Sequence, residues 1–200
     1  LFSSFTMYVI LLMVPLYIQD MRGGSEAQAG LLLGVMALSM VGLTPIAGLV
    51  ADRVGRRQPA VFGAIILVVG ASLSNLLGTT TSWWSVIAML WVIGAGMASL
   101  TAIQQTAAVE SLPKENAGSA AGIFSTTRYI GGLFATGAIA GILGSGKLDT
   151  VEPLHLLTMA ITISAVGAVL CATQLHRWPP EINSNGTNSS NHKVREEAST

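Results

Sequence analysis

Charge is scarce in this sequence, and that scarcity excludes a soluble protein. Asp, Glu, Lys and Arg make up 10% of the 200 residues, whereas about a quarter of the residues in a soluble domain are charged. Four long stretches contain no such residue: 1–19, 27–51, 58–109 and 153–175. Roughly 20 apolar residues of helix cross a bilayer core about 30 Å thick. These stretches therefore indicate a membrane protein with several spans.

Other absences exclude further classes of protein. The single cysteine, Cys171, excludes a disulfide framework and a cysteine-based metal site. The formal net charge is zero, so nothing indicates a basic surface for nucleic acid. No G-x-x-x-x-G-K-[ST] loop, metal-ligand cluster or nucleophile motif occurs, so we expect no enzyme, no ATP-driven pump, no cofactor and no metal. Residue 1 is Leu, and the basic start and cleavage site of a signal peptide are missing. We therefore expect the C-terminal part of a longer chain.

The apolar runs predict an all-α fold, a polytopic transmembrane bundle of six helices within residues 1–177. The uncharged run 58–109 must contain two of these helices, because one helix of that length would far exceed the thickness of a bilayer. The polar segment 178–200 is rich in Asn and Ser and is expected to be a disordered cytoplasmic tail. The expected spans are residues 2–19, 28–50, 59–78, 84–108, 118–143 and 153–175.

The charges in the loops predict the orientation, since Lys and Arg accumulate on the cytoplasmic side of a membrane. We therefore expect a multi-pass plasma-membrane protein whose 51–58 loop, 109–117 loop and C-terminus lie in the cytoplasm. The expected cytoplasmic side carries Arg53, Arg56, Arg57, Lys114, Arg177, Lys193 and Arg195, whereas the other side carries only Arg22 and Lys147.

The first of these loops combines charge with glycine. Asp52 and Arg56 are four residues apart, a spacing that allows an ion pair on a helix. Gly48 and Gly55 allow close helix approach and a tight turn. If the arginines served only to set the topology, neither the acid nor the glycines would be needed. The loop reads GLVADRVGRR over residues 48–57, and its candidate gating residues are Gly48, Asp52, Arg53, Gly55, Arg56 and Arg57.

This pattern resembles the signature loop of the major facilitator superfamily, G-x-x-x-D-R-x-G-R-R, which joins the second and third helices of a six-helix half. The resemblance implies half of such a transporter fold. It also implies that the loop is a latch whose acid and bases hold one state of an alternating-access cycle. Residues 89–96 lack the arginine that many N-terminal halves carry. We therefore interpret the chain as a C-terminal half, whose partner is the missing N-terminal half or a second copy.

Two further stretches, residues 14–34 and 112–141, resemble drug:proton antiporters of that superfamily. They imply secondary active transport that exports drug-like or amphipathic small molecules across the lipid bilayer, with the proton as a possible coupling ion. No carboxylate lies within the expected spans, so a proton-binding acid would have to come from the missing half. Two alternatives stay open: a superfamily transporter of sugars or organic acids, and a six-helix membrane assembly protein without transport.

Five residues within the expected spans are candidates for lining a cavity or binding a substrate. Arg128 comes first, because it lies about ten residues into the span 118–143 in a stretch without other charges. A charge at membrane depth faces the protein interior or water, unless Arg128 reaches back to the cytoplasmic surface. The other candidates are Gln104, Gln105, Tyr8 and Trp91. For the two amides, hydrogen bonding between helices is the alternative.

Two polar residues and several glycines have simpler expected roles. We expect Tyr17 at the membrane–water interface or against lipid, and Asn75 at the interface. Small residues let membrane helices approach closely. The glycine pairs expected to pack helices in this way are Gly30 and Gly34, Gly94 and Gly96, Gly118 and Gly122, and Gly137 and Gly141.

Overall fold

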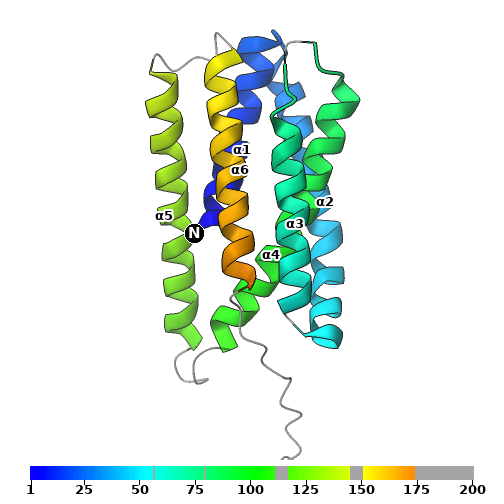
Figure 1. Cartoon of the computed structure of the whole chain (residues 1–200), viewed down its shortest axis with the longest axis vertical. Helices are drawn as coiled ribbons and strands as arrows, with labels where there is room; N and C mark the ends of the chain where they lie inside the picture. Colours follow the sequence, from blue (N-terminus) through cyan, green and yellow to red (C-terminus); the bar gives the residue numbers. More distant parts are fainter. Residues whose placement is uncertain (56, 79, 111–116, 145–150, 174–200) are drawn as a thin grey trace, which may run out of the picture.

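A computed structural model describes residues 1–55, 57–78, 80–110, 117–144 and 151–173. Within them the chain forms six α-helices and one π-helical turn, and no strand (Figure 1). The expected all-α fold with six helices is confirmed, whereas the predicted tail 178–200 lies outside the described residues. The helices are α1 (Phe2–Leu16), continued by the π-helical turn η1 (Tyr17–Met21), α2 (Glu26–Val54), α3 (Arg57–Ser74), α4 (Trp83–Glu110), α5 (Ala117–Leu143) and α6 (Val151–Thr173).

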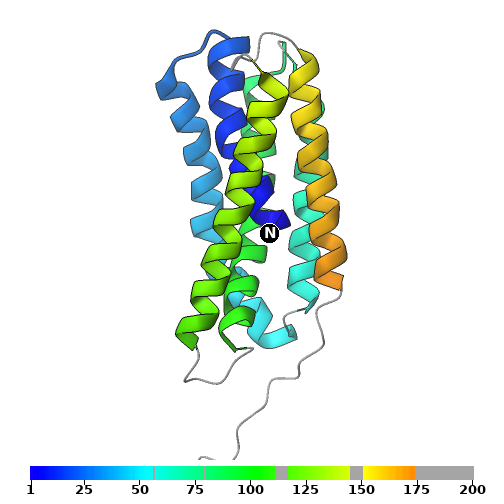
Figure 2. The ribbon, with the colours of Figure 1, turned by 90° about the vertical axis from the view of Figure 1, so that its left-hand side faces the viewer.

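The helices run along one long axis (Figures 1 and 2). Helices from the first three of the chain pack against helices from the last three. α4 packs against both α2 and α3, whereas α1 packs against α5 and α6, and a contact between α3 and α6 joins the two groups. Gly55, after α2, lies at one end of the bundle, and Gly78, after α3, lies at the other. We call these the Gly55 end and the Gly78 end. The chain N-terminus lies at mid-height of the bundle.

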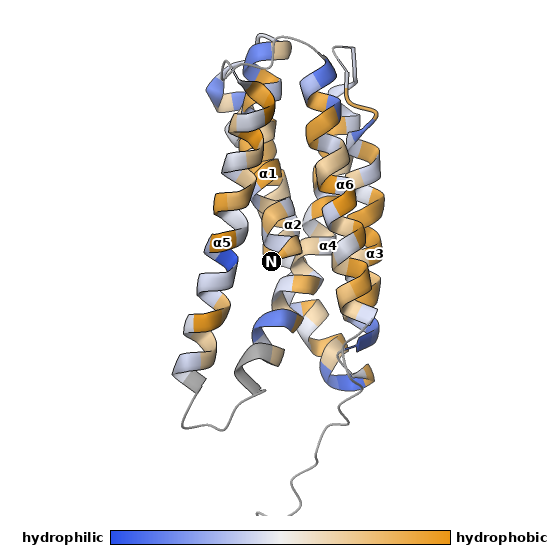
Figure 3. Ribbon diagram, turned by 60° about the vertical axis from the view of Figure 1, so that its left-hand side comes forward, coloured by the Kyte–Doolittle hydropathy of each residue, from blue (hydrophilic) through white to orange (hydrophobic). Residues whose placement is uncertain are grey.

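Five of the described helical segments are long and apolar enough to cross a membrane. They are Phe2–Met21, Glu26–Val54, Arg57–Ser74, Trp83–Ala107 and Glu152–Thr173. α5 is not among them, although it has 27 residues. Its middle, residues 125–129, contains hydroxyl side chains and Arg128, and Figure 3 shows this hydrophilic interruption at mid-length. A charged residue at mid-length distinguishes α5 from the other described helices.

Glycines set the closest approaches of α4 to its neighbours. A Cβ atom at Gly94 would lie 2.7 Å from the Met36 carbonyl oxygen of α2, and one at Gly96 would lie 2.7 Å from the Leu67 nitrogen of α3. The expected packing role of this pair is therefore confirmed. The other three glycine pairs do not have this packing role among the described residues. An added Cβ atom would meet nothing within 4 Å at Gly30, Gly34, Gly118, Gly122, Gly137 or Gly141. α2 and α5 therefore turn these glycines away from the rest of the bundle.

Asn75 lies in a hydrogen-bond network between helices just after the end of α3, and its expected place at the membrane interface stays a prediction. Its amide nitrogen donates to Thr162 Oγ1 at 3.0 Å, and Thr158 Oγ1 donates to Asn75 Oδ1 at 2.9 Å. Thr162 Oγ1 also donates to the Ala71 carbonyl oxygen at 3.2 Å. α3 ends at Ser74, before the expected boundary at residue 78. The chain turns there, and the amide reaches α6.

Replacing Asn75 by alanine should lower the free energy of unfolding by about 1 kcal/mol. Hydrogen bonds between membrane helices contribute roughly 0.6 to 2 kcal/mol, and both threonines would lose their shared partner. The measurement is an SDS titration of the chain in mixed micelles, followed by circular dichroism. Ser72→Ala, at an exposed position of α3, is the control and should change the value by less than about 0.5 kcal/mol. Equal stabilities of Asn75→Ala and wild type would show that the network contributes nothing.

Candidate functional site

The predicted gating residues lie at the Gly55 end, where α2 ends and α3 begins. α2 continues through Asp52 and Arg53 to Val54, and Gly55 follows with φ at +86°, in the region that favours glycine. Arg57 is already the first residue of α3. Gly55 is thus the tight turn that the sequence predicts. Arg56 lies outside the described residues, so its pairing with Asp52 stays a prediction.

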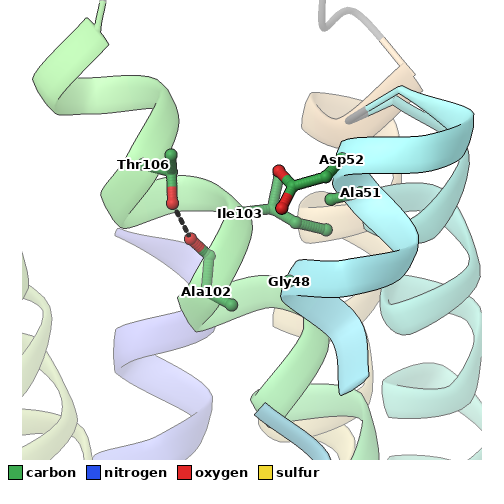
Figure 4. A pocket seen from close by; sticks show the side chains of 6 residues that line it. All are labelled: Gly48, Ala51, Asp52, Ala102, Ile103 and Thr106. Atoms are coloured by element: carbon green, nitrogen blue, oxygen red, sulfur yellow. Dashed lines mark hydrogen bonds between the residues drawn. The ribbon is translucent and has the colours of Figure 1, made fainter. Parts of the chain in front are cut away.

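Asp52 borders a cleft between α2 and α4, which Figure 4 shows from close by. The side chain is exposed, and its carboxylate points across the cleft toward α4. The Thr106 hydroxyl on the other wall donates to a carbonyl of its own helix at 2.8 Å. The lining residues are Gly48, Ala51 and Asp52 from α2, and Ala102, Ile103 and Thr106 from α4. The cleft therefore presents an exposed carboxylate to whatever approaches this end of the bundle.

The position of Asp52 is unfavourable for the helix that carries it. Asp52 is two residues from Val54, the last residue of α2. Negative charge near a helix C-terminus opposes the helix dipole, at a cost of about 0.3 to 1 kcal/mol. Helix stability therefore does not account for an acid here.

Two of the cavity candidates contact neighbouring helices. Gln104 Oε1 accepts a hydrogen bond of 3.0 Å from Ser3 Oγ, which ties α4 to the first turn of α1. The Tyr8 ring packs against α5, since a Cβ atom at Gly132 would lie 3.0 Å from it. Gln105 is exposed. The two adjacent amides therefore differ: Gln104 bonds helix to helix, and Gln105 is open to further contacts.

The five cavity candidates do not form one pocket. Arg128 is exposed on α5, and it lies one turn before Gly132, the residue that contacts Tyr8. Trp91 is 49% exposed, and it precedes Gln104 by 13 residues on α4, or about 20 Å along the helix axis. The first half of α1 therefore brings Tyr8 and Gln104 close to the Arg128 turn of α5. Trp91 lies nearer the Gly78 end.

A cluster at the Gly78 end was not anticipated from the sequence. The guanidinium carbon of Arg22 lies 4.4 Å from the centre of the Trp83 ring and 5.9 Å from that of Tyr17. Tyr17 is 1% exposed, and its hydroxyl donates to the Gly78 carbonyl oxygen at 2.7 Å. The expectation that Tyr17 faces lipid or the interface is therefore wrong, because η1 closes α1 onto the connection between α3 and α4. Tyr17 and Trp83 are far apart in sequence, so no local pattern signals this cluster.

Replacing Trp83 by leucine should lower the free energy of unfolding by about 1 to 2 kcal/mol. The change removes the ring that lies closest to the Arg22 guanidinium, and a partly desolvated cation–π contact contributes about that much. The matched control is Trp84→Leu at the next position, where the ring is 78% exposed. Both variants are measured by SDS unfolding in mixed micelles. Equal losses for the two would mean that the Arg22 contact contributes nothing specific.

Comparison with known proteins indicates one family. The family model described as Major Facilitator Superfamily matches residues 1–136. The chain is 29% identical over 152 residues to the Multidrug resistance protein Stp of Mycobacterium tuberculosis, which covers 76% of the chain and 28% of that protein. It is 27% identical over 151 residues to the Multidrug transporter protein MdtP of Bacillus subtilis, with 74% of the chain and 28% of that protein covered.

A third relative has an equally short overlap. The chain is 30% identical over 146 residues to the Tetracenomycin C resistance and export protein of Streptomyces glaucescens. That match covers 72% of the chain and 26% of the relative. The chain therefore spans less than a third of the length of these three proteins.

Proposed function

The chain belongs to the Major Facilitator Superfamily, and from that premise we propose that it is one six-helix half of an exporter of drug-like or amphipathic small molecules. Membership makes it a membrane transport protein rather than an enzyme. Export as the direction is supported by the names of three relatives, which refer to multidrug resistance, multidrug transport, and resistance and export. The mechanism in this proposal is alternating access, in which two halves rock about a site near the bilayer midplane.

The observation that carries the half-transporter proposal is the pair of glycine faces on α2 and α5. Glycines at membrane helix surfaces allow another helix to approach closely. On these two helices, Cβ atoms at Gly30, Gly34, Gly118 and Gly122 would meet nothing within 4 Å among the described residues. The chain also covers less than a third of the length of three relatives. The proposed occupant of both faces is the other half of the transporter, supplied by the same protein or by a second copy.

The cleft at Asp52 is the proposed gate. The Asp52 carboxylate lowers the stability of α2 and faces an open cleft. In this proposal it makes a contact in only one state of the transport cycle. The residues that complete this latch are Gly48, Arg53, Gly55, Arg56 and Arg57. In the proposed orientation, the Gly55 end and the C-terminal tail lie in the cytoplasm, since most Lys and Arg residues of the loops belong to that side.

The proposed coupling ion is the proton, bound outside these six helices. Each Asp and Glu of the described helices lies within three residues of a helix end. An acid that binds a proton at membrane depth would therefore belong to the other half. Transport of organic acids is the second candidate function, because Arg128 is a cation at membrane depth that such substrates would match.

The test is a comparison of the 200-residue chain with the complete open reading frame that contains it. Both are expressed in cells that lack their own efflux pumps, and export of the neutral amphipathic dye Nile red is measured. The complete protein should export the dye, and the chain alone should not. Equal export by the chain alone would mean that a second copy supplies the other half. Absence of export of Nile red and of amphipathic acids by the complete protein would contradict the proposal.

A further inference from the structure

The end of α1 departs from regular helical winding. α1 contains Pro15, which has no N–H group to donate within the helix. The residues that follow, Tyr17–Met21, form the π-helical turn η1, the only such turn in the described residues. Its hydrogen bonds span one residue more than those of an α-helix, and single turns of this kind are rare and occur frequently at functional sites. The winding of the chain can therefore change at this point.

Two contacts hold the end of α1 against the connection between α3 and α4. The Tyr17 hydroxyl donates to the Gly78 carbonyl oxygen at 2.7 Å. The guanidinium carbon of Arg22 lies 4.4 Å from the centre of the Trp83 ring, and the Tyr17 ring lies 5.9 Å from the same carbon. Tyr17 and Ile18 are 1% and 0% exposed, so η1 is closed onto the bundle. We call Tyr17, Arg22 and Trp83 the aromatic gate, and all of its contacts are made within these six helices.

Opposing interactions act on Arg22 in the aromatic gate. Its Nη1 atom is buried and has no hydrogen-bond acceptor among the described residues. Burying an N–H group without an acceptor is unfavourable, whereas a guanidinium over the face of an indole ring is favourable. Opening the gate would let water bond to the guanidinium, and this gain offsets part of the lost ring contact. The balance suits a contact that is made and broken repeatedly.

We propose that the aromatic gate closes the Gly78 end of the transport path and that η1 is the hinge on which the end of α1 opens. The inference rests on the proposed transport function, because alternating access requires the path to open at one end at a time. Return of η1 to α-helical winding would rotate the residues after it by about 100°, the angle per residue of an α-helix. That rotation carries Arg22 off the Trp83 ring. Hinges of this kind are a few residues at the end of an element that absorb the backbone change.

The first test measures the accessibility of Ile18, which is fully buried in the closed gate. Ile18→Cys is introduced into the complete protein with its other cysteines replaced by serine. The purified protein in lipid nanodiscs is then labelled with the water-soluble thiol reagent MTSET. Adding Trp83→Leu should raise the labelling rate about five- to thirtyfold, the change in open fraction expected for loss of a partly desolvated cation–π contact. Trp83→Phe keeps a ring at this position and should raise the rate less.

The matched control for labelling is Asn75→Ala. It removes hydrogen bonds between helices at the same end of the bundle without changing a residue of the aromatic gate. It should leave the labelling rate near that of Ile18→Cys alone. Equal increases in Asn75→Ala and Trp83→Leu would show that Ile18 becomes accessible through a general loss of stability, and would overturn the proposal. An unchanged rate in Trp83→Leu would overturn it as well.

The second test locks the aromatic gate in the complete protein. Arg22→Cys and Trp83→Cys are joined by a bifunctional methanethiosulfonate reagent, and export of Nile red is measured before joining, after joining and after reduction. Export should stop when the pair is joined and return on reduction, because a closed gate blocks the path. The control pair is Asn75→Cys with Thr162→Cys, whose native side chains are hydrogen-bonded at 3.0 Å, and joining it should leave export unchanged.

The two tests separate the gate from the transport function. Equal export by the joined and the reduced Arg22→Cys, Trp83→Cys protein would show that the gate stays closed during transport, and would overturn the proposal. Faster labelling of Ile18→Cys in Trp83→Leu, in a protein that exports neither Nile red nor amphipathic acids, would uphold the hinge and contradict the proposed export.

Discussion

The Gly96→Leu variant should yield no folded protein. A Cβ atom at this position would lie 2.7 Å from the Leu67 nitrogen, 2.9 Å from the Gly63 carbonyl oxygen and 2.9 Å from Leu67 Cα. All three are backbone atoms, so no side-chain rotation can make room, and α3 and α4 would have to separate. Overpacking of a core costs about 1 to 3 kcal/mol even where side chains can shift. A leucine side chain against rigid backbone should lower the free energy of unfolding by more than that. The measurement is size-exclusion chromatography in detergent, where Gly96→Leu should lose the monodisperse peak.

The control makes the same exchange on α2. Gly42 is exposed, and a Cβ atom there would meet nothing within 4 Å among the described residues. Gly42→Leu should therefore leave the six helices folded, with unfolding in SDS close to that of wild type. A folded Gly96→Leu protein would show that α3 and α4 do not pack as closely as described. The two variants separate a glycine required by this bundle from a glycine on an open face.

The comparison of these two glycines also shows how far the sequence predicts the packing. Gly94 and Gly96 could be recognised as small residues in an apolar run, and so could Gly30 and Gly34. Nothing in the local pattern distinguishes the pairs, because both occur within apolar helices. What distinguishes them is that α4 has neighbours on two sides whereas one face of α2 has none in the described chain. The six helices could therefore be predicted from hydropathy, but their partners could not.

Structural features that depend on residues adjacent in sequence could be predicted, whereas features that depend on contacts between distant residues could not. Gly55 could be predicted as a tight turn, because its charged surroundings and the two flanking apolar runs are adjacent in sequence. The burial of Tyr17 could not, because it depends on a hydrogen bond to Gly78, some 60 residues later. The hydrogen bonds of Asn75 could not be predicted for the same reason, since its partners Thr158 and Thr162 belong to the last helix.

Replacing Asp52 by asparagine should slow export by about tenfold or more while leaving the fold intact. In the proposed latch, the charge stabilises one state of the cycle, and coupling free energies between such states are about 1 to 3 kcal/mol, or 5- to 150-fold. The fold should not suffer, because the side chain is exposed and near the C-terminus of α2, where removing negative charge relieves an unfavourable interaction with the helix dipole. We therefore expect slightly higher stability together with lower activity, measured as dye export by the complete protein and SDS unfolding of the chain.

That combination separates a latch from a topology signal. If the loop served only to hold arginines in the cytoplasm, Asp52→Asn would add net positive charge on that side and would leave export at the wild-type rate. The control is Glu26→Gln at the opposite end of the same helix, another exposed acid, which should keep export within about twofold because it is remote from the cleft. Lower stability of Asp52→Asn would contradict the physical basis of the proposal, since the acid would then be holding α2 and α4 together within this chain rather than awaiting a contact from the other half.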